Sequence, residues 1–224
     1  MKNIQNVVFV KWGDKYSSDH VINLYKSLFK YNSECNYYCL TDSDADTLIE
    51  HNIKTISLSH KPALKKWWNK LKMFDKNLPV NNLTPHALVG KCLYFDLDIK
   101  INSDPFLVLD QINWDKLTMI DCHWKQSDLY HRLSNYDVNV NSSVLAWDTE
   151  QSNAEEIWDH FIDSGYKDYF LRKYVGIDRY IVHEDFSYNT FPQDFIQSYK
   201  YEKNKIAPVT TFEEVDFEGT NIKS

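Results

Sequence analysis

The chain has 224 residues, of which 43% are hydrophobic and 25% are charged, and its formal net charge at pH 7 is -7. Its length suits one α/β domain over residues 1–224, and its hydrophobic content excludes an intrinsically disordered chain. The negative charge argues against a non-specific nucleic-acid binder, which would usually be basic. The sequence shows neither an apolar signal segment after Met1 nor a run of membrane-spanning length, so we expect a cytoplasmic protein without a membrane span.

The sequence contains four cysteines: Cys35, Cys39, Cys92 and Cys122. Cys35 and Cys39 are four positions apart, whereas a zinc knuckle requires three, and no histidine pair completes a zinc site with them. We therefore expect all four cysteines to be reduced side chains that pack in the core.

The first half of the chain alternates short apolar runs with apolar residues at helical spacing, which favours a mostly parallel sheet flanked by helices. Residues 17–19 (Ser-Ser-Asp) supply N-cap chemistry for the first helix. The expected strands cover residues 6–10, 37–40 and 54–58, and the expected helices cover residues 21–28 and 44–50.

A third helix is expected around Pro62, a residue suited to the first turn of a helix. Trp67, Leu71 and Phe74 then recur at helical spacing, and core packing is the simplest interpretation of this stripe, above all for Leu71 and Phe74. Lys70 lies on another face of the helix, where it is either a solvated charge or a side chain that reaches a phosphate.

The second half continues the same pattern. The Asp104-Pro105 dipeptide predicts a turn, and polar residues precede an expected strand over 144–147. Ser152 and Glu155 match a capping box, and Gly165 suits the position just after the end of the helix. The remaining expectations are strands over 117–120 and 195–199, a loop over 128–136, a helix over 176–184 and a polar, mobile tail over 203–224.

The stretch Cys92–Ile99 is the most informative part of the sequence. Its apolar residues indicate a strand that is buried on both faces, and Asp96 and Asp98 come at its end. Alternate side chains of a strand point to the same side, so these carboxylates can converge at the carboxyl edge of the sheet, where open α/β sheets bind ligands. Such a pair suits a Mn²⁺ or Mg²⁺ ion that neutralises a diphosphate, and the alternative is two solvated turn carboxylates.

Two other phosphate-handling classes fit the sequence poorly. Haloacid-dehalogenase-type phosphatases carry a D-x-D-x-[T/V] motif after their first strand, but here the pair lies in mid-chain and Lys100 occupies the fifth position. The loop after the first expected strand contains only one glycine, Gly13, which disfavours a dinucleotide fingerprint or a P-loop.

Together these features resemble a GT-A glycosyltransferase of the glycogenin-like (family 8-like) group, especially its small bacterial and phage members with a D-x-D motif. The resemblance runs from about Asn6 to Tyr199 and implies a GT-A (nucleotide-diphospho-sugar transferase) fold. It also implies a hexosyltransferase that uses UDP-glucose or UDP-galactose and retains the configuration of the sugar. The stretches that carry it are Val8–Gly13 with Tyr16, Trp67–Leu71, Leu93–Asp98, Asn141–Leu145 with Trp147, and, more loosely, Gly176–Ile181.

The resemblance implies how a UDP-sugar donor and its metal would be held. Asp96 would contact both the ribose and the metal, with Leu97 beside it, and Asp98 would bind Mn²⁺ or Mg²⁺. The residues that would hold the uridine are Val10, Lys11, Trp12, Tyr16 and Asp42.

By the same resemblance, Lys70 and Asp178 are the candidate catalytic residues, Lys70 near the diphosphate and the donor sugar and Asp178 near the reacting carbon. Asn141 and Ser142 would hydrogen-bond the sugar. Plainer interpretations remain open, because Asn141 suits a turn before a strand, Asp178 suits the first turn of a helix, and Trp12 suits packing.

The sequence also departs from the resembled group. That group carries a late segment whose histidine is the third metal ligand and whose lysine contacts the diphosphate, but no histidine follows His183 here. Water or the diphosphate would then complete the metal site. If the reaction were inverting, Asp121, Asp178 or Glu184 would be the candidate general base.

Three other functions stay open at this stage. A sugar nucleotidyltransferase would need a Gly-rich N-terminal loop, which the single Gly13 disfavours. A non-catalytic carbohydrate-binding protein would suit the seven Trp and fifteen Tyr residues, and a degenerate transferase would suit the absence of the late histidine. The acceptor, a carbohydrate or glycoconjugate, is not specified by any of these features.

Overall fold

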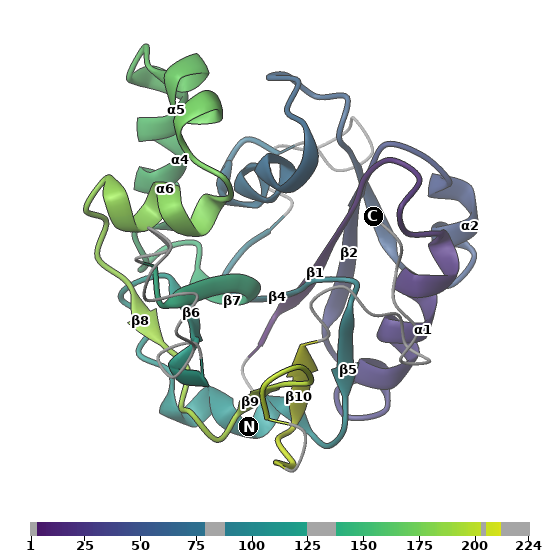
Figure 1. Cartoon of the computed structure of the whole chain (residues 1–224). Helices are drawn as coiled ribbons and strands as arrows, with labels where there is room; N and C mark the ends of the chain where they lie inside the picture. Colours follow the sequence, from purple (N-terminus) through teal and green to yellow (C-terminus); the bar gives the residue numbers. More distant parts are fainter. Residues whose placement is uncertain (1–3, 79–87, 125–137, 203–204, 212–224) are drawn as a thin grey trace.

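A computed structural model describes residues 4–78, 88–124, 138–202 and 205–211 (Figure 1). Its centre is a seven-stranded sheet in which only β7 runs antiparallel to its neighbours, and every other pairing is parallel. The predicted α/β fold with a mostly parallel sheet is confirmed. In spatial order the strands are β3 (Lys54–Ser57), β2 (Asn36–Thr41), β1 (Asn6–Lys11), β4 (Lys91–Phe95), β7 (Val140–Asp148), β6 (Thr118–Asp121) and β8 (Asn189–Thr190).

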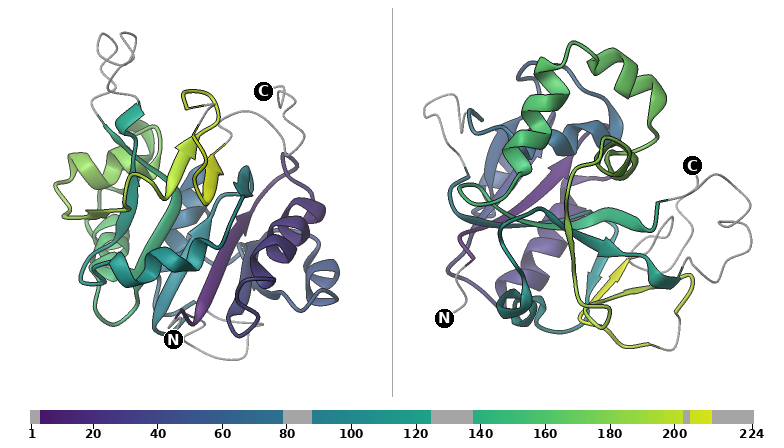
Figure 2. Two further views of the ribbon diagram at one scale, coloured as in Figure 1. Left: turned by 90° about the horizontal axis from the view of Figure 1, so that it is seen from below. Right: turned by 90° about the vertical axis from the view of Figure 1, so that its left-hand side faces the viewer.

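The sheet is covered on both faces, which explains why its central strands are continuous apolar runs. Along β1, Val7 and Phe9 point into one core, and Val8 and Val10 point into the other. Figure 2 shows the two layers on opposite sides of the sheet. One layer contains α1 (Ser18–Phe29), α2 (Ala45–Ile49) and η2 (Pro105–Gln111), and the other contains η1 (Lys66–Phe74), α4 (Ala154–Asp163), α5 (Lys167–Lys173) and α6 (Ile177–His183).

A second, three-stranded sheet lies on the same side as α1 and was not expected from the sequence. It consists of β5 (Ile99–Ile101), β10 (Val209–Thr211) and β9 (Ile196–Ser198), with β10 in the middle. The prediction that everything after Glu202 is a mobile tail is therefore wrong for β10, whose three residues are buried. β5, which follows Asp98, was not predicted either and forms by pairing with β10. The Asp104-Pro105 dipeptide, predicted as a turn, begins the 3₁₀ helix η2 (Pro105–Gln111), with Asp104 as its N-cap.

Several local predictions need correction. The helix expected around Pro62 begins only at Lys66, with Lys65 as its N-cap, and it is a 3₁₀ helix. The expected capping box at Ser152 is not formed: the N-cap is Asn153, and the carboxylate of Glu155 pairs with Lys76 instead. The polar residues expected to precede strand 144–147 belong to β7 itself, and α5 was not predicted.

Other predictions are confirmed. Ser17 is the N-cap of α1, and Gly165 adopts a left-handed backbone (φ +74°) just after α4. All four cysteines are free and buried. Within the described ranges no helix is long and apolar enough to span a membrane. The loop expected over 128–136 and most of the tail lie outside the described residues.

Candidate active site

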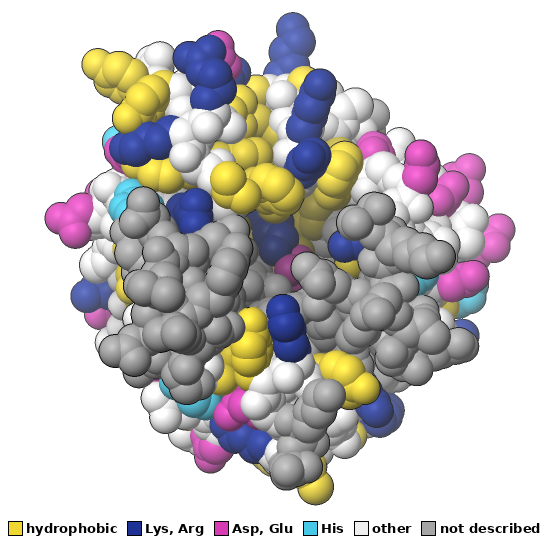
Figure 3. Space-filling model, viewed as in Figure 1, with side chains coloured by type: hydrophobic (Ala, Val, Ile, Leu, Met, Phe, Trp, Pro, Cys, Tyr) yellow, Lys and Arg dark blue, Asp and Glu magenta, His cyan; other side chains and the backbone are white. Residues whose placement is uncertain are grey.

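A cleft of about 720 Å³ lies at the carboxyl ends of β1 and β4. In Figure 3 the face of the molecule is hollowed near its centre, with basic and acidic side chains in the hollow and hydrophobic side chains above it. The lining residues come from β1 and its loop (Val10, Trp12, Lys15, Tyr16), from η1 (Lys66, Trp67, Lys70), and from the end of β4 (Tyr94, Asp96, Leu97, Asp98).

Asp96 is held by contacts to both of its carboxylate oxygens. The Tyr94 hydroxyl, two residues earlier on the same side of β4, donates a hydrogen bond to Oδ1. Lys70 Nζ lies 2.8 Å from Oδ2. The backbone N–H of Asp96 donates to the carbonyl of Ser143 on β7 at 2.8 Å, so the sheet ladder continues to this residue. Asp96 is therefore fixed by backbone and side-chain contacts at the edge of the sheet.

Asp98 shares the cleft with Asp96, but not through the expected alternation of a strand, because β4 ends at Phe95 and Leu97 and Asp98 form a turn. Burial raises the pKa of its carboxyl group to about 6, and the charge of Asp96 adds to this effect, whereas Lys70 and Lys15 oppose it. Burial also raises the pKa of the Tyr16 hydroxyl, with further contributions from Asp98, to which it hydrogen-bonds, and from Asp96. The site therefore places two carboxylates close together, and Lys70 and Lys15 are the cations whose charges act on Asp98.

Lys70 connects three parts of the site. Besides its ion pair with Asp96, its Nζ lies 3.4 Å from the Ser142 carbonyl and 3.5 Å from the Ser142 hydroxyl on β7. It also lies over the ring of Tyr94, 5.4 Å from the centroid. Ser142 is buried, and the structure thus brings Lys70, Ser142 and Asp96, three residues that the sequence analysis singled out, into contact.

The position of Lys70 depends on how η1 is anchored. Lys72 is only 2% exposed, and its Nζ donates to the carbonyls of Leu58 at 2.7 Å and His60 at 2.6 Å. Burial lowers the pKa of this ammonium group. On the opposite side Trp68 stacks on Phe161 of α4, with ring centroids 5.3 Å apart. These contacts hold η1 against the sheet and direct its other face to the cleft.

The carboxylate pair suits a divalent cation only in part. Among the described residues, no group of three or more His, Cys, Asp or Glu side chains is placed to hold a metal ion. Asp96 and Asp98 supply hard oxygen ligands, and their mutual repulsion, visible in the raised pKa of Asp98, would be relieved by Mn²⁺ or Mg²⁺. The pair therefore fits a metal whose remaining ligands come from a bound diphosphate or water.

The predicted uridine-binding residues do not all face the cleft. Val10, Trp12 and Tyr16 line it. Lys11 is 2% exposed, and its Nζ is bonded to the Ser43 hydroxyl at 2.7 Å and to Asp44 at 3.1 Å. The Lys11 side chain thus braces the end of β2 and is directed away from the cleft.

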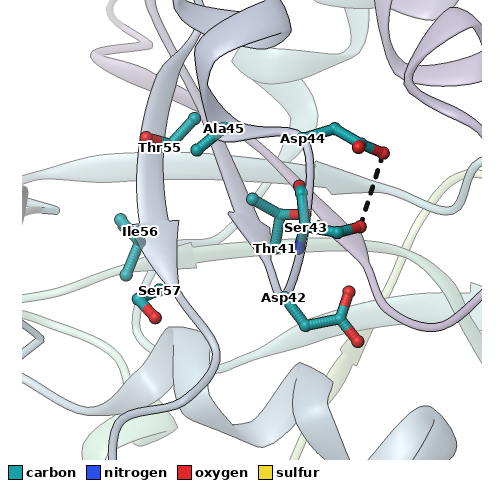
Figure 4. A pocket seen from close by; sticks show the side chains of 8 residues that line it. All are labelled: Thr41, Asp42, Ser43, Asp44, Ala45, Thr55, Ile56 and Ser57. Atoms are coloured by element: carbon teal, nitrogen blue, oxygen red, sulfur yellow. Dashed lines mark hydrogen bonds between the residues drawn. The ribbon is translucent and has the colours of Figure 1, made fainter.

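Asp42 lies at a second, smaller cavity of about 280 Å³ between the ends of β2 and β3 (Figure 4). Its Oδ2 accepts a hydrogen bond from the Gly13 N–H at 2.8 Å. Gly13 has a left-handed backbone (φ +62°), a conformation that glycine adopts without strain. Asp42 therefore fixes the loop that carries Trp12, Lys15 and Tyr16 to the cleft.

The remaining predicted residues do not line the cleft. Asn141 on β7 accepts a hydrogen bond from the Ser143 N–H at 2.7 Å. Asp178 is in the first turn of α6, which packs against β7 and η1, but it does not line the cleft. Asp121 accepts a hydrogen bond from Gln193 at 3.1 Å, and Glu184 is bonded to Tyr174 and Lys173.

Sequence reasoning missed four lining residues: Lys15, Lys66, Trp67 as a cleft residue, and Tyr94. The two-residue spacing between Tyr94 and Asp96 was a usable signal. Trp67 is 37% exposed, because η1 is a 3₁₀ helix and turns a different set of residues inward, whereas Leu71 and Phe74 are buried as predicted.

The sheet order, the single antiparallel strand β7 and the acidic pair after β4 together define a GT-A fold. Solved glycosyltransferases share it. The galactosyltransferase LgtC, solved with donor and acceptor sugar analogues, superposes with a TM-score of 0.61 at 16% sequence identity, over 93% of this chain and 87% of LgtC.

Two further similar structures come from other sources. GlyE of Streptococcus pneumoniae TIGR4 has a TM-score of 0.59 at 15% identity, over 94% of this chain and 56% of GlyE. Mouse xyloside xylosyltransferase 1 has a TM-score of 0.54 at 8% identity, over 93% and 97% of the two chains. Such low identities establish the fold alone. The sequence matches no known protein family and no curated protein.

Proposed function

We propose that this protein is a metal-dependent glycosyltransferase of the glycogenin-like group. It would act in the cytoplasm and move a hexose from UDP-glucose or UDP-galactose to a carbohydrate or glycoconjugate acceptor. The observation that carries the proposal is the Asp96–Asp98 pair at the end of β4, braced by Lys70 inside the cleft of a GT-A fold. Support for a sugar-nucleotide donor comes from the glycosyltransferases that share this fold.

The roles of the residues follow from their chemistry. Asp96 and Asp98 would hold Mn²⁺ or Mg²⁺, which supplies Lewis-acid neutralisation of the donor diphosphate when bound. Tyr94 and Lys70 each bond one oxygen of Asp96 and keep it oriented toward the cleft. Once the donor is bound, Lys70 can share its three N–H donors between Asp96 and a phosphate oxygen. Ser142 on β7 contacts Lys70, and Asn141 precedes Ser142 on the same strand; both would contact the donor sugar.

We further propose that the reaction retains the anomeric configuration, with Asp178 near the reacting carbon. Support for this role comes from the packing of α6 against β7 and η1, the two elements that carry Ser142 and Lys70. Proton NMR of the first product formed from the α-linked donor gives the configuration directly. A β-linked product would refute retention and would direct attention to Asp121 and Glu184 as general bases.

Calorimetric titration with UDP, with and without Mn²⁺, tests the metal-dependent donor site. We expect binding that needs the metal and is lost in Asp98→Ala. Asp110→Asn changes an exposed carboxylate on η2 that does not line the cleft, so it is the matched control and should bind as the wild type does. UDP binding that is independent of the metal and unaffected by Asp98→Ala would refute the proposal.

The exposed indole rings of Trp12 and Trp67 favour one alternative, a carbohydrate-binding protein without catalysis. Aromatic faces in an open cleft are suited to stacking on sugar rings. This function predicts that a free oligosaccharide binds without nucleotide or metal, and that no UDP is released from UDP-hexoses in the presence of Mn²⁺. Assays of UDP release with an array of acceptor sugars separate the two functions.

A further inference from the structure

Two cleft lysines have no role in the site described so far. Lys15 follows β1 and Lys66 begins η1, and both line the cleft that contains Asp96 and Asp98. Both side chains are exposed, and within the described part of the chain neither forms an ion pair. Lys15 Nζ lies 5.0 Å from the Tyr16 ring centroid, and Lys66 Nζ lies 5.4 Å from the Trp67 ring centroid. These two cations are available to a ligand.

Lys15 lines the same cleft as the two carboxylates. It directly precedes Tyr16, which hydrogen-bonds to Asp98, and both Lys15 and Tyr16 line the cleft together with the carboxylates. A ligand held at Asp96 and Asp98 would therefore lie within the electrostatic reach of Lys15.

Lys66 is placed by an unusual backbone. Its φ is +56°, in the left-handed region that a non-glycine side chain adopts at an energetic cost. Such strain persists where the surrounding structure fixes it, and it is common at ligand-binding positions. Here it turns the chain at the start of η1, so that Lys66 and Lys70 both reach the cleft while Lys72 remains buried.

The charges in the cleft match a diphosphate. Three lysines and two aspartates leave one net positive charge, in a protein whose overall charge is -7. One bound divalent cation would raise the net charge of the cleft to three positive charges. A released nucleoside diphosphate carries roughly three negative charges near pH 7, since its terminal phosphate has a second pKa of about 6. Without Lys15 and Lys66, the same cleft and metal would offer only one positive charge.

We propose that Lys15 and Lys66 bind the donor diphosphate from two sides of the cleft and stabilise it as it departs. This inference rests on the proposed function. In the transfer, the bond between the anomeric carbon and the diphosphate oxygen breaks with its electron pair on that oxygen. The acceptor hydroxyl forms the new bond to the carbon, and its proton passes to the released diphosphate. The two ammonium groups stay protonated and act on the charge that develops on the diphosphate.

The test compares ligands that share a base but differ in phosphate. UDP binding in the presence of Mn²⁺ is measured by calorimetry, and uridine binding by ligand-observed NMR, for Lys15→Gln, Lys66→Gln and the double variant. Lys26→Gln removes the same charge from an exposed position on α1 and is the control. We expect each cleft substitution to weaken UDP binding at least about tenfold and to leave uridine binding within about twofold. Lys15→Arg and Lys66→Arg should restore most of the UDP affinity, and the salt dependence of UDP binding should become shallower in the double variant.

The outcomes are distinguishable. If the wild type binds UDP with Mn²⁺ but the double variant binds it equally well, the inference is wrong and the donor site stands. If UDP and uridine binding weaken equally, the lysines act on the shape of the site and the inference is also wrong. If the wild type binds neither ligand, the proposed function itself fails.

Discussion

Lys70 and Asp96, 26 positions apart in the sequence, form an ion pair in the cleft with 2.8 Å between Nζ and Oδ2. Their side chains are 12% and 20% exposed, so solvent screens the pair less than it would at the surface. Because the pair joins η1 to the end of β4, it couples the placement of the 3₁₀ helix to the placement of the carboxylates.

The first prediction concerns Lys70. In Lys70→Gln, Asp96 loses its cationic partner, and the two carboxylates repel each other more strongly. We expect the rate of UDP release from the preferred UDP-hexose to fall at least about a hundredfold, which is the usual effect of removing one donor that stabilises developing charge. Lys70→Arg keeps the charge and should recover part of the rate. Equal rates for Lys70→Gln and the wild type would exclude a catalytic role for Lys70.

The second prediction concerns the pH dependence of stability. The pKa of Asp98 is raised to about 6 in the folded protein, from an ordinary value near 3.8. The folded state therefore holds this proton more tightly than the unfolded state does. The resulting stabilisation is complete below pH 3.8 and is lost as the pH rises through 6. Above pH 6 the wild type must bury an ionised Asp98 in the folded state, which lowers its stability. Asp98→Asn removes this charge, so we expect the variant to be more stable than the wild type above pH 6, by about 1–2 kcal/mol.

Urea denaturation at several pH values, with EDTA present, measures this difference. The stability gap between Asp98→Asn and the wild type should open between pH 4 and pH 6 and stay constant above. The same variant should lose Mn²⁺-dependent UDP binding, so stability and function would change in opposite directions. A gap that does not vary with pH would show that Asp98 is not the titrating group.

The third prediction concerns the buried Lys72. Lys72→Met fills a similar volume but leaves the carbonyls of Leu58 and His60 without their donor. We expect the free energy of unfolding to fall by about 2–3 kcal/mol, which is the cost of leaving buried polar groups without a hydrogen-bond partner. Lys76→Met, an exposed lysine paired with Glu155, is the control and should have a much smaller effect. If the two substitutions had equal effects, Lys72 would not anchor η1.

The fourth prediction concerns β10. Val209 is fully buried in the core beneath the small sheet, whereas Ile206, three residues earlier, is 92% exposed. Val209→Ala should lower the free energy of unfolding by about 2 kcal/mol, and Ile206→Ala by less than about 0.5 kcal/mol. Thermal or urea unfolding of both variants tests whether β10 belongs to the cooperative core. No destabilisation by Val209→Ala would contradict the placement of this strand.

The sequence by itself determined the central sheet and the acidic pair. Strands such as β1 and β4 are continuous apolar runs because both faces are covered, and that pattern is readable without a structure. Asp96 and Asp98 come directly after the β4 run, and this position in the sequence predicted that both lie at the end of the strand. Both do line the cleft there, although a turn at Leu97 and Asp98 replaces the expected extended chain. Both patterns lie within a few consecutive residues, so they can be read from the sequence without knowing which distant segments make contact.

The tertiary structure decided which other residues share the cleft. Lys15 and Lys66 look like ordinary surface lysines in the sequence, and only the packing of the loop after β1 and of η1 brings them to the carboxylates. Lys11 has the same chemistry and lies on β1, yet Ser43 and Asp44 hold it away from the cleft. The strand β10 was hidden for a similar reason, because three residues become a strand only when β5 and β9 pair with them. Contacts between segments far apart in the chain leave no pattern in the local sequence, so only the tertiary structure reveals them.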